Sequence, residues 1–239
     1  MPDLYSYNWS DKSKSRVTLQ DLKDRIAISI NAGKEKIKNV DILDFTALKF
    51  AETAIWPYPV KKKNECNFVE FINQLFTTAA SIKAIQYLEA EERFWEMRLG
   101  TTSGRDLTVY SDEEKKSPEI IAEIFAVTDP TSNSKLKDEI ISLAKNNKAE
   151  GNCEKISRRI AFFILGKSSF ENLDEKYESW TEYTPKGLNK KKIEISEQIS
   201  RPQNNSKEAR WKCVCENETI EIVCWSSENC LTDFDATGN

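Results

Sequence analysis

Histidine is absent from the whole chain of 239 residues. Ser–His–Asp and Cys–His nucleophile systems and histidine-ligated zinc are therefore excluded, because each of them needs an imidazole. Long apolar runs are missing as well: no segment approaches the roughly 18 residues of a membrane span. The N-terminus also lacks the basic-then-apolar order of a signal peptide. We expect a cytoplasmic protein without a membrane segment, whose chemistry rests on carboxylates, lysines and cysteines.

An excess of positive charge is also lacking. The 35 Lys and Arg residues face 39 Asp and Glu residues, which gives a formal net charge of -4. No global positive field can hold nucleic acid, so DNA binding would depend on local patches such as Lys61 to Lys63 and Lys190 to Lys192. A chain of this length is expected to form one large core with a smaller addition, since single cores stop growing near ~250 residues.

The N-terminal third has the periodicity of helices. Apolar residues recur at three and four positions, and Thr18 with Asp21 is close to a capping box. The pattern predicts three helices, over 18–38, 44–55 and 67–91. We assign 1–66 to an N-terminal helical region and begin the core at 67.

From Arg93 onward the apolar period falls to two, which indicates strands. The predicted core elements are strands over 94–99 and 105–111, a strand over 119–127, a helix over 133–147 and a buried strand over 159–165. This order predicts an α/β core over 67–170, with a central sheet flanked by helices. The polar segment 171–209 is expected to be a linker or peripheral segment, and 210–239 a small cysteine-containing β-hairpin with a tail.

Two carboxylates stand out within these predicted strands. Asp106 shares a face of its strand with Thr108 and Tyr110, while Glu123 interrupts an otherwise apolar strand. If the strands are neighbours, the two acids converge near one edge of the sheet. Two carboxylates, a backbone carbonyl such as that of Ile124, and water suit Mg²⁺ or Mn²⁺. Such a metal polarises a phosphodiester and lowers the pKa of a bound water.

The order helix, hairpin with Asp106, strand with Glu123, helix and apolar strand resembles the PD-(D/E)xK nuclease superfamily, which includes restriction and repair endonucleases. The resemblance covers roughly 67–165. Arg105 stands in place of the family's proline, and Phe125 in place of its lysine. The resemblance implies a restriction endonuclease-like mixed sheet and Mg²⁺-dependent hydrolysis of DNA by an endonuclease.

Some branches of that superfamily carry the lysine on the helix that follows, and the segment from Glu123 through the polar turn at 129–133 is similar to that variant. Lys135 and Lys137 are the candidates there. With about 100° per residue, the buried stripe of this helix contains Leu136, Ile140, Leu143 and Ala144. Lys137 lies at the flank of the stripe and Lys135 points almost directly away. We expect Lys137 to be the catalytic lysine, with Lys135 as the second candidate.

The same residues also permit a structural interpretation. Asp106 can end a hairpin, Glu123 can pair with Arg98 or Arg105, and the lysines can be solvated. Three functions follow: an active endonuclease, a catalytically inactive nuclease-fold protein that binds DNA or protein, and a protein-interaction module. Because restriction-type nucleases often dimerise to cut two strands, a homodimer is a further option.

Four cysteines lie close together near the end of the chain, at positions 213, 215, 224 and 230. Four thiolates can hold a tetrahedral zinc ion, but structural zinc ribbons show C-x₂-C knuckles, which this spacing lacks. We expect buried or merely reduced thiols, with Zn²⁺ at Cys213, Cys215, Cys224 and Cys230 as the lesser alternative.

Overall fold

The computed structural model describes residues 19–38, 68–89, 94–97, 105–111, 117–127, 135–145, 156–173, 194–200 and 208–231. The described strands are β1 (Phe94–Met97), β2 (Leu107–Tyr110), β3 (Pro118–Val127), β4 (Arg158–Leu165), β5 (Glu194–Ser200), β6 (Glu208–Cys215) and β7 (Glu218–Ser226). The described helices are α1 (Leu19–Lys38), α3 (Phe68–Tyr87), α4 (Lys135–Ala144), α5 (Lys167–Glu171) and α7 (Ser227–Leu231).

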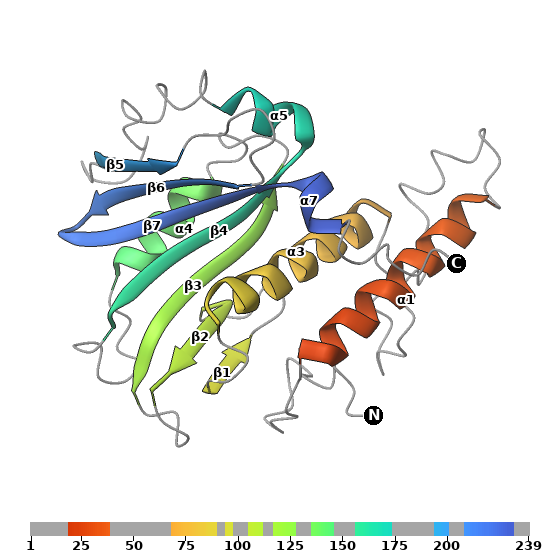
Figure 1. Ribbon diagram of the computed structural model, residues 1–239, viewed down its shortest axis with the longest axis horizontal. Helices are drawn as coiled ribbons and strands as arrows, with labels where there is room; N and C mark the ends of the chain where they lie inside the picture. Colours follow the sequence, from red (N-terminus) through yellow and green to blue (C-terminus); the bar gives the residue numbers. More distant parts are fainter. Residues whose placement is uncertain are drawn as a thin grey trace. The chain divides into compact units, whose positions relative to one another are not determined.

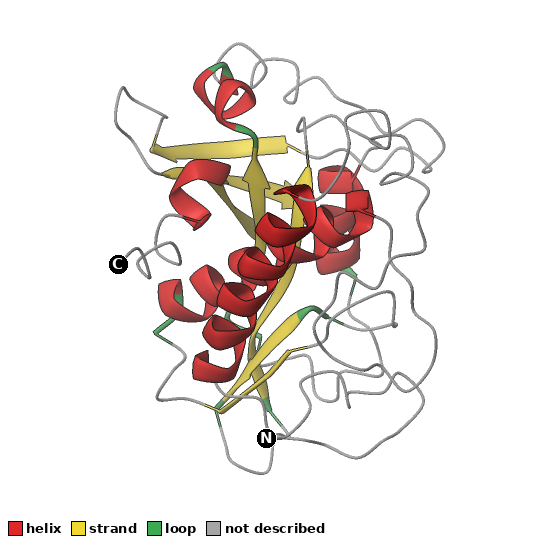
Figure 2. Ribbon diagram, turned by 90° about the vertical axis from the view of Figure 1, so that its right-hand side faces the viewer, coloured by secondary structure: helices red, strands yellow, loops and turns green. Residues whose placement is uncertain are grey.

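The strands form one seven-stranded sheet in the order β1-β2-β3-β4-β7-β6-β5 (Figure 1). β1, β2 and β3 make an antiparallel meander, and α4 then leads to β4, which pairs in parallel with β3. β7 continues the parallel part beside β4, while β6 and β5 are antiparallel. The protein is therefore a mixed α/β fold, and its strands twist relative to one another (Figure 2).

Most predicted elements are confirmed within a few residues, namely the helices at 18–38 and 133–147 and the strands at 94–99, 105–111, 119–127 and 159–165. The long helix α3 ends at Tyr87 rather than near 91. Glu89, with φ of 49°, adopts the left-handed conformation that commonly terminates helices. The predicted helix at 44–55 and both lysine runs lie outside the described residues.

The C-terminal part differs from the predicted division. The hairpin at 210–227 exists as β6 and β7, with Glu216 and Asn217 at positive φ in its turn. It is not a separate unit, because β7 pairs in parallel with β4. The segment 171–209, predicted as a linker or peripheral segment, contributes the edge strand β5, and α5 lies at the end of the predicted core. The physical reason is that the apolar strand β4 needs a neighbour on each side, which β3 and β7 supply.

One face of the sheet is covered by α4, which packs on β3, β4, β6 and β7. Side chains alternate along each strand, so Phe125, Phe163, Trp211 and Ile222 project into this core together with α4 and Phe170 of α5. These residues make the part of the core that lies on the α4 side of the sheet. It is the same side on which Glu123 lies, since Glu123 and Phe125 are two residues apart on β3.

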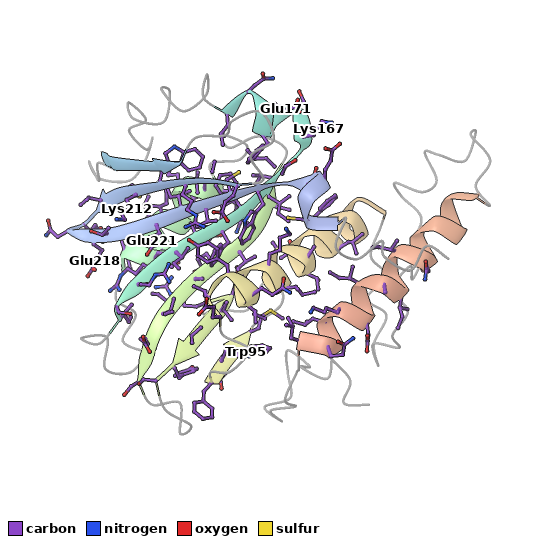
Figure 3. The ribbon with its side chains drawn as sticks, in the orientation of Figure 1. Trp95, Lys167, Glu171, Lys212, Glu218 and Glu221 are labelled. Atoms are coloured by element: carbon purple, nitrogen blue, oxygen red, sulfur yellow. The ribbon has the colours of Figure 1, made fainter. Side chains whose placement is uncertain are left out.

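The opposite face carries an aromatic group and a charged row. Phe162 and Trp225 stack with ring centroids 5.1 Å apart, and Tyr87 meets the Phe162 ring edge-on at 5.4 Å. Arg158 makes two hydrogen bonds of 2.8 Å to Glu221. Lys212 of β6 lies opposite Glu221 in the strand register, towards the hairpin end of the sheet (Figure 3).

The chain divides into two units, one of residues 1–82 with 231–239 and the other of residues 83–230. In the first, α1 buries Leu22 and Ile26, which are four residues apart on one helical face. In the second lies the whole sheet. None of the described helices is both long enough and apolar enough to span a membrane.

Candidate functional site

Asp106 and Glu123 come together because β2 and β3 are adjacent. Leu107 pairs with Ala122 in the antiparallel register, so the next position places Asp106 beside Glu123 on the α4 face. Oδ2 of Asp106 accepts a hydrogen bond of 2.8 Å from the backbone N–H of Ile124. In an extended strand the N–H and C=O of one residue point to the same side. The Ile124 carbonyl therefore faces the same edge of β3 as Asp106.

Glu123 is buried and forms an ion pair with Arg105, which is buried as well. Its Oε1 accepts hydrogen bonds from Nη1 of Arg105 at 3.0 Å and from the Ser142 hydroxyl at 3.3 Å. Arg105 also donates to Oγ of Ser142 at 2.8 Å and to the Lys145 carbonyl at 2.9 Å. Of the two arginine partners that the sequence left open for Glu123, Arg105 is the one observed, and Arg98 lies outside the described residues. Arg105 thus joins the start of β2 to β3 and to the C-terminal end of α4.

One oxygen of each acid has no hydrogen-bond donor. Both donors to Glu123 use Oε1, and the donor to Asp106 uses Oδ2, so within the described part of the chain Oε2 and Oδ1 accept no hydrogen bond. These two oxygens and the Ile124 carbonyl are hard donors of the kind that Mg²⁺ prefers. The described residues contain no group of three or more His, Cys, Asp or Glu side chains placed to hold a metal ion.

The surroundings of the two acids disfavour their ionised forms. Burial and the negative charge of Glu123 raise the pKa of Asp106 to about 8, although the Ile124 N–H acts in the opposite direction. Burial and the charge of Glu139 raise the pKa of Glu123 against the lowering effect of Arg105. Carboxyl groups that share a buried site repel one another when ionised. A divalent cation would relieve this repulsion.

Lys135 interacts electrostatically with both acids. Its Nζ pairs with the carboxylate of Glu139 and lies 5.9 Å from the centroid of the Phe125 ring. Burial lowers the pKa of Lys135, but its hydrogen bond to Glu139 and the charges of Glu139, Asp106 and Glu123 raise it above its ordinary value. Lys135 is exposed, as expected for a residue that points away from the buried stripe of the helix, and its catalytic role stays a prediction.

The position of α4 on the sheet explains how Lys135 can interact with the acids. The helix packs across β3, β4, β6 and β7, so the flank beside β3, and not the centre of its buried stripe, faces the acids. That flank is made by Lys135, Glu139 and Ser142, which follow one another at four and three residues. Lys135 is also the first residue of α4, where helical side chains lean towards the N-terminus.

Lys137 is buried, as the predicted stripe implies. About 200° of rotation separates it from Glu139 at 100° per residue, which leaves the two about 160° apart around the helix. Lys137 thus projects from the flank opposite to the one that carries Glu139. Its catalytic role stays a prediction, and the geometry favours Lys135.

Sequence reasoning missed two contributors to this site and one role of a third. Arg105 was considered as an ion-pair partner of Glu123 but not as a donor to α4, and Ser142 and Glu139 were not considered. A usable signal existed: three polar residues at i, i+4 and i+7 along an amphipathic helix mark one of its edges. This edge is the one that lies beside Glu123.

The four C-terminal cysteines are buried thiols. Cys213, Cys215 and Cys224 belong to the core under α4. Burial raises the pKa of Cys213 to about 12 and also raises that of Cys224. Zinc binds thiolates, and among the described residues no set of three such ligands is gathered.

We compared the chain with known proteins in three ways. No family model, no curated protein and no solved structure matches it. The two acids, the lysine and the sheet that positions them are the features that bear on function.

Proposed function

We propose that the protein is a metal-dependent endonuclease that hydrolyses DNA phosphodiester bonds, with a restriction endonuclease-like core of the PD-(D/E)xK type. The element order supports this: α3, the meander β1 to β3, then α4, then β4 in parallel beside β3. One observation carries the proposal. Half-buried Asp106 and buried Glu123 lie side by side, each with one oxygen that accepts no hydrogen bond from the described residues, and a lysine of the next helix interacts with both electrostatically.

The chain's own residues have distinct parts in this proposal. Oδ1 of Asp106, Oε2 of Glu123 and the Ile124 carbonyl would hold Mg²⁺ or Mn²⁺. When bound, the metal supplies polarisation of the phosphodiester and a water of lowered pKa. Arg105 keeps Glu123 oriented through the other oxygen. Lys135 places a positive charge where the phosphate develops negative charge, and Lys137 is the alternative lysine.

A cleavage assay tests this function. Supercoiled plasmid is incubated with the protein and Mg²⁺, Mn²⁺ or EDTA, and nicked and linear products are measured. We expect metal-dependent cleavage that is abolished in Asp106→Asn and Glu123→Gln. Asp138→Asn is the matched control, since Asp138 is exposed on the same helix. Cleavage that persists in both acid variants would refute the proposed site.

A second function is favoured by two specific observations. Phe125 occupies the position of the family's lysine, and Arg105 already neutralises Glu123. Both suit a nuclease-fold protein without catalysis that binds DNA or another protein. A DNA mobility shift without cleavage under any divalent ion would support this alternative. Sedimentation of the same sample, which measures mass, tests the proposed homodimer.

A further inference from the structure

We propose that Phe125 and Glu139 are positioning residues that hold the ammonium group of Lys135 beside Asp106 and Glu123. The inference rests on the proposed nuclease function. It also gives Phe125 a role. The aromatic ring stands where the resembled family has its lysine, and it would position Lys135, the lysine that α4 supplies.

The Phe125 ring is a fixed platform. It lies on β3 on the same face as Glu123, since the two residues are two apart. Its exposed fraction is 4%, and it stacks on Phe163 with centroids 5.6 Å apart and planes 10° apart. Nζ of Lys135 lies 5.9 Å from its centroid, within the roughly 6 Å range of a cation–π interaction.

Glu139 supplies the second restraint. It lies one helical turn after Lys135, and its carboxylate pairs with Nζ. The Lys135 side chain is 48% exposed, whereas that of Glu139 is 14% exposed. A lysine has a flexible four-carbon stem, and an unrestrained one samples many positions in solvent. The ring and the carboxylate together keep the ammonium on the side of α4 that faces the acids.

The structural alternative is an ordinary helix-surface ion pair. Such an i, i+4 pair contributes little to stability and has no reason to affect a reaction. The two accounts differ in what Glu139→Gln and Phe125→Leu change. A surface pair alters stability slightly, whereas a positioning pair alters the surroundings of Lys135 and the rate of catalysis.

The first test does not depend on cleavage. The full-length protein is labelled with ¹³C at lysine Cε, and the Lys135 signal is identified by its loss in Lys135→Met and followed through a pH titration by NMR. We expect Glu139→Gln to lower the pKa of Lys135 and Phe125→Leu to remove a ring-current shift of the ε-methylene. Asp138→Asn is the control and should change neither. An unchanged Lys135 signal in both variants would overturn the inference.

The second test is kinetic. We expect Glu139→Gln and Phe125→Leu to lower kcat by about tenfold to a hundredfold with KM nearly unchanged, since misplacement of a catalytic group has effects of this size. The conservative Phe125→Tyr should keep kcat near that of the wild type. If kcat is unchanged in both Glu139→Gln and Phe125→Leu while both remain folded, the inference is wrong.

A rescue variant sharpens the result. Lys135→Met combined with Phe125→Lys returns an ammonium to the strand, at the position that the ring now occupies. Recovery of cleavage relative to Lys135→Met alone would support one shared ammonium position. If the double variant folds, as judged by circular dichroism, and remains as inactive as Lys135→Met, the shared position is refuted. If it does not fold, the decision rests on the two single variants above.

The two tests separate this inference from the proposed function. Intact NMR signatures of the Lys135 contacts with no cleavage by the wild type would refute the nuclease but support the positioning of Lys135. Metal-dependent cleavage without those signatures would support the nuclease and refute the positioning of Lys135.

Discussion

Arg105 and Glu123 form a buried ion pair, with Nη1 of the arginine 3.0 Å from Oε1 of the glutamate and both side chains less than a tenth exposed. Arg105 directly precedes Asp106 in the sequence. One short segment therefore supplies both an acid of the site, Asp106, and the cation that pairs with the other acid, Glu123. The same guanidinium also reaches the Lys145 carbonyl at 2.9 Å, at the end of α4. This relationship links the stability of the core to the geometry of the acids.

Arg105→Met should therefore destabilise the protein strongly. The variant leaves Glu123 buried without its cation, and loss of one partner of a buried pair typically reduces the free energy of unfolding by about 3–5 kcal/mol. Urea unfolding followed by circular dichroism measures the change. Arg158→Met is the control, because the Arg158–Glu221 pair is partly exposed and should contribute at most about 1 kcal/mol. Equal effects of the two substitutions would contradict the prediction.

Asp106→Asn should stabilise the protein in weakly alkaline solution. The pKa of Asp106 is raised to about 8 in the folded state by burial and by Glu123, whereas an unfolded aspartate titrates near 3.9. Between these values the folded state binds the extra proton, so the free energy of unfolding falls as the pH rises from about 4 to about 8. The variant has no such proton to lose.

We expect Asp106→Asn to be more stable than the wild type at about pH 8 by at least about 1 kcal/mol, close to the equivalent of one pKa unit. The two should converge near pH 4. Urea unfolding across this range measures both trends. Asp138→Asn, at an exposed position of α4, should follow the wild type. The prediction fails if the variant is less stable than the wild type at pH 8 and its free energy of unfolding depends on pH as that of the wild type does. The pKa of Asp106 would then not be raised in the folded state.

The meander, α4 and β4 could be predicted because their apolar periods are local and unambiguous. β5 could not: its sequence Glu-Ile-Ser-Glu-Gln-Ile-Ser contains only two apolar residues, and it is defined by irregular pairing with β6. The insertion of the C-terminal hairpin beside β4 depends on a contact between distant segments. No local pattern encodes that contact.

The site, like the fold, could be predicted as far as local patterns determine it. Strand alternation predicted that Asp106 and Glu123 would converge if their strands were neighbours, and β2 and β3 are paired. Helix phase identified the buried stripe of α4 correctly. Helix phase alone does not say which flank of the stripe faces the acids, because that depends on where α4 lies on the sheet. Lys135 was consequently ranked below Lys137, and the role of Glu139 was not foreseen.

Lys135→Met should lower kcat far more than Lys137→Met. Lys135 interacts electrostatically with both acids, and removal of one group that stabilises developing negative charge typically lowers kcat by about 10²- to 10³-fold. Methionine keeps most of the side-chain volume in both variants. Single-turnover cleavage with saturating Mg²⁺ measures the difference. A larger loss in Lys137→Met, at unchanged stability, would restore Lys137 as the catalytic lysine.

The C-terminal thiols should be inert in the folded protein. The pKa of Cys213 is raised to about 12 by burial, and a buried thiol with little thiolate reacts slowly. The chain has two further cysteines, Cys66 and Cys153. When both are replaced by serine, we expect Ellman's reagent to detect thiols only after urea is added. A zinc chelator should not change the rate. Rapid reaction in native buffer, or a chelator-dependent increase, would instead favour a thiolate metal site.

Calorimetric titration with Mn²⁺ tests the central claim most directly, that Asp106 and Glu123 hold a divalent cation. We expect the wild type to show binding heat that is stronger at pH 8 than at pH 6, because the metal competes with the proton on Asp106. Asp106→Asn should give only the heat of dilution, and Asp138→Asn should match the wild type. Dilution heat alone from the wild type, or equal binding by Asp106→Asn, would contradict the metal site.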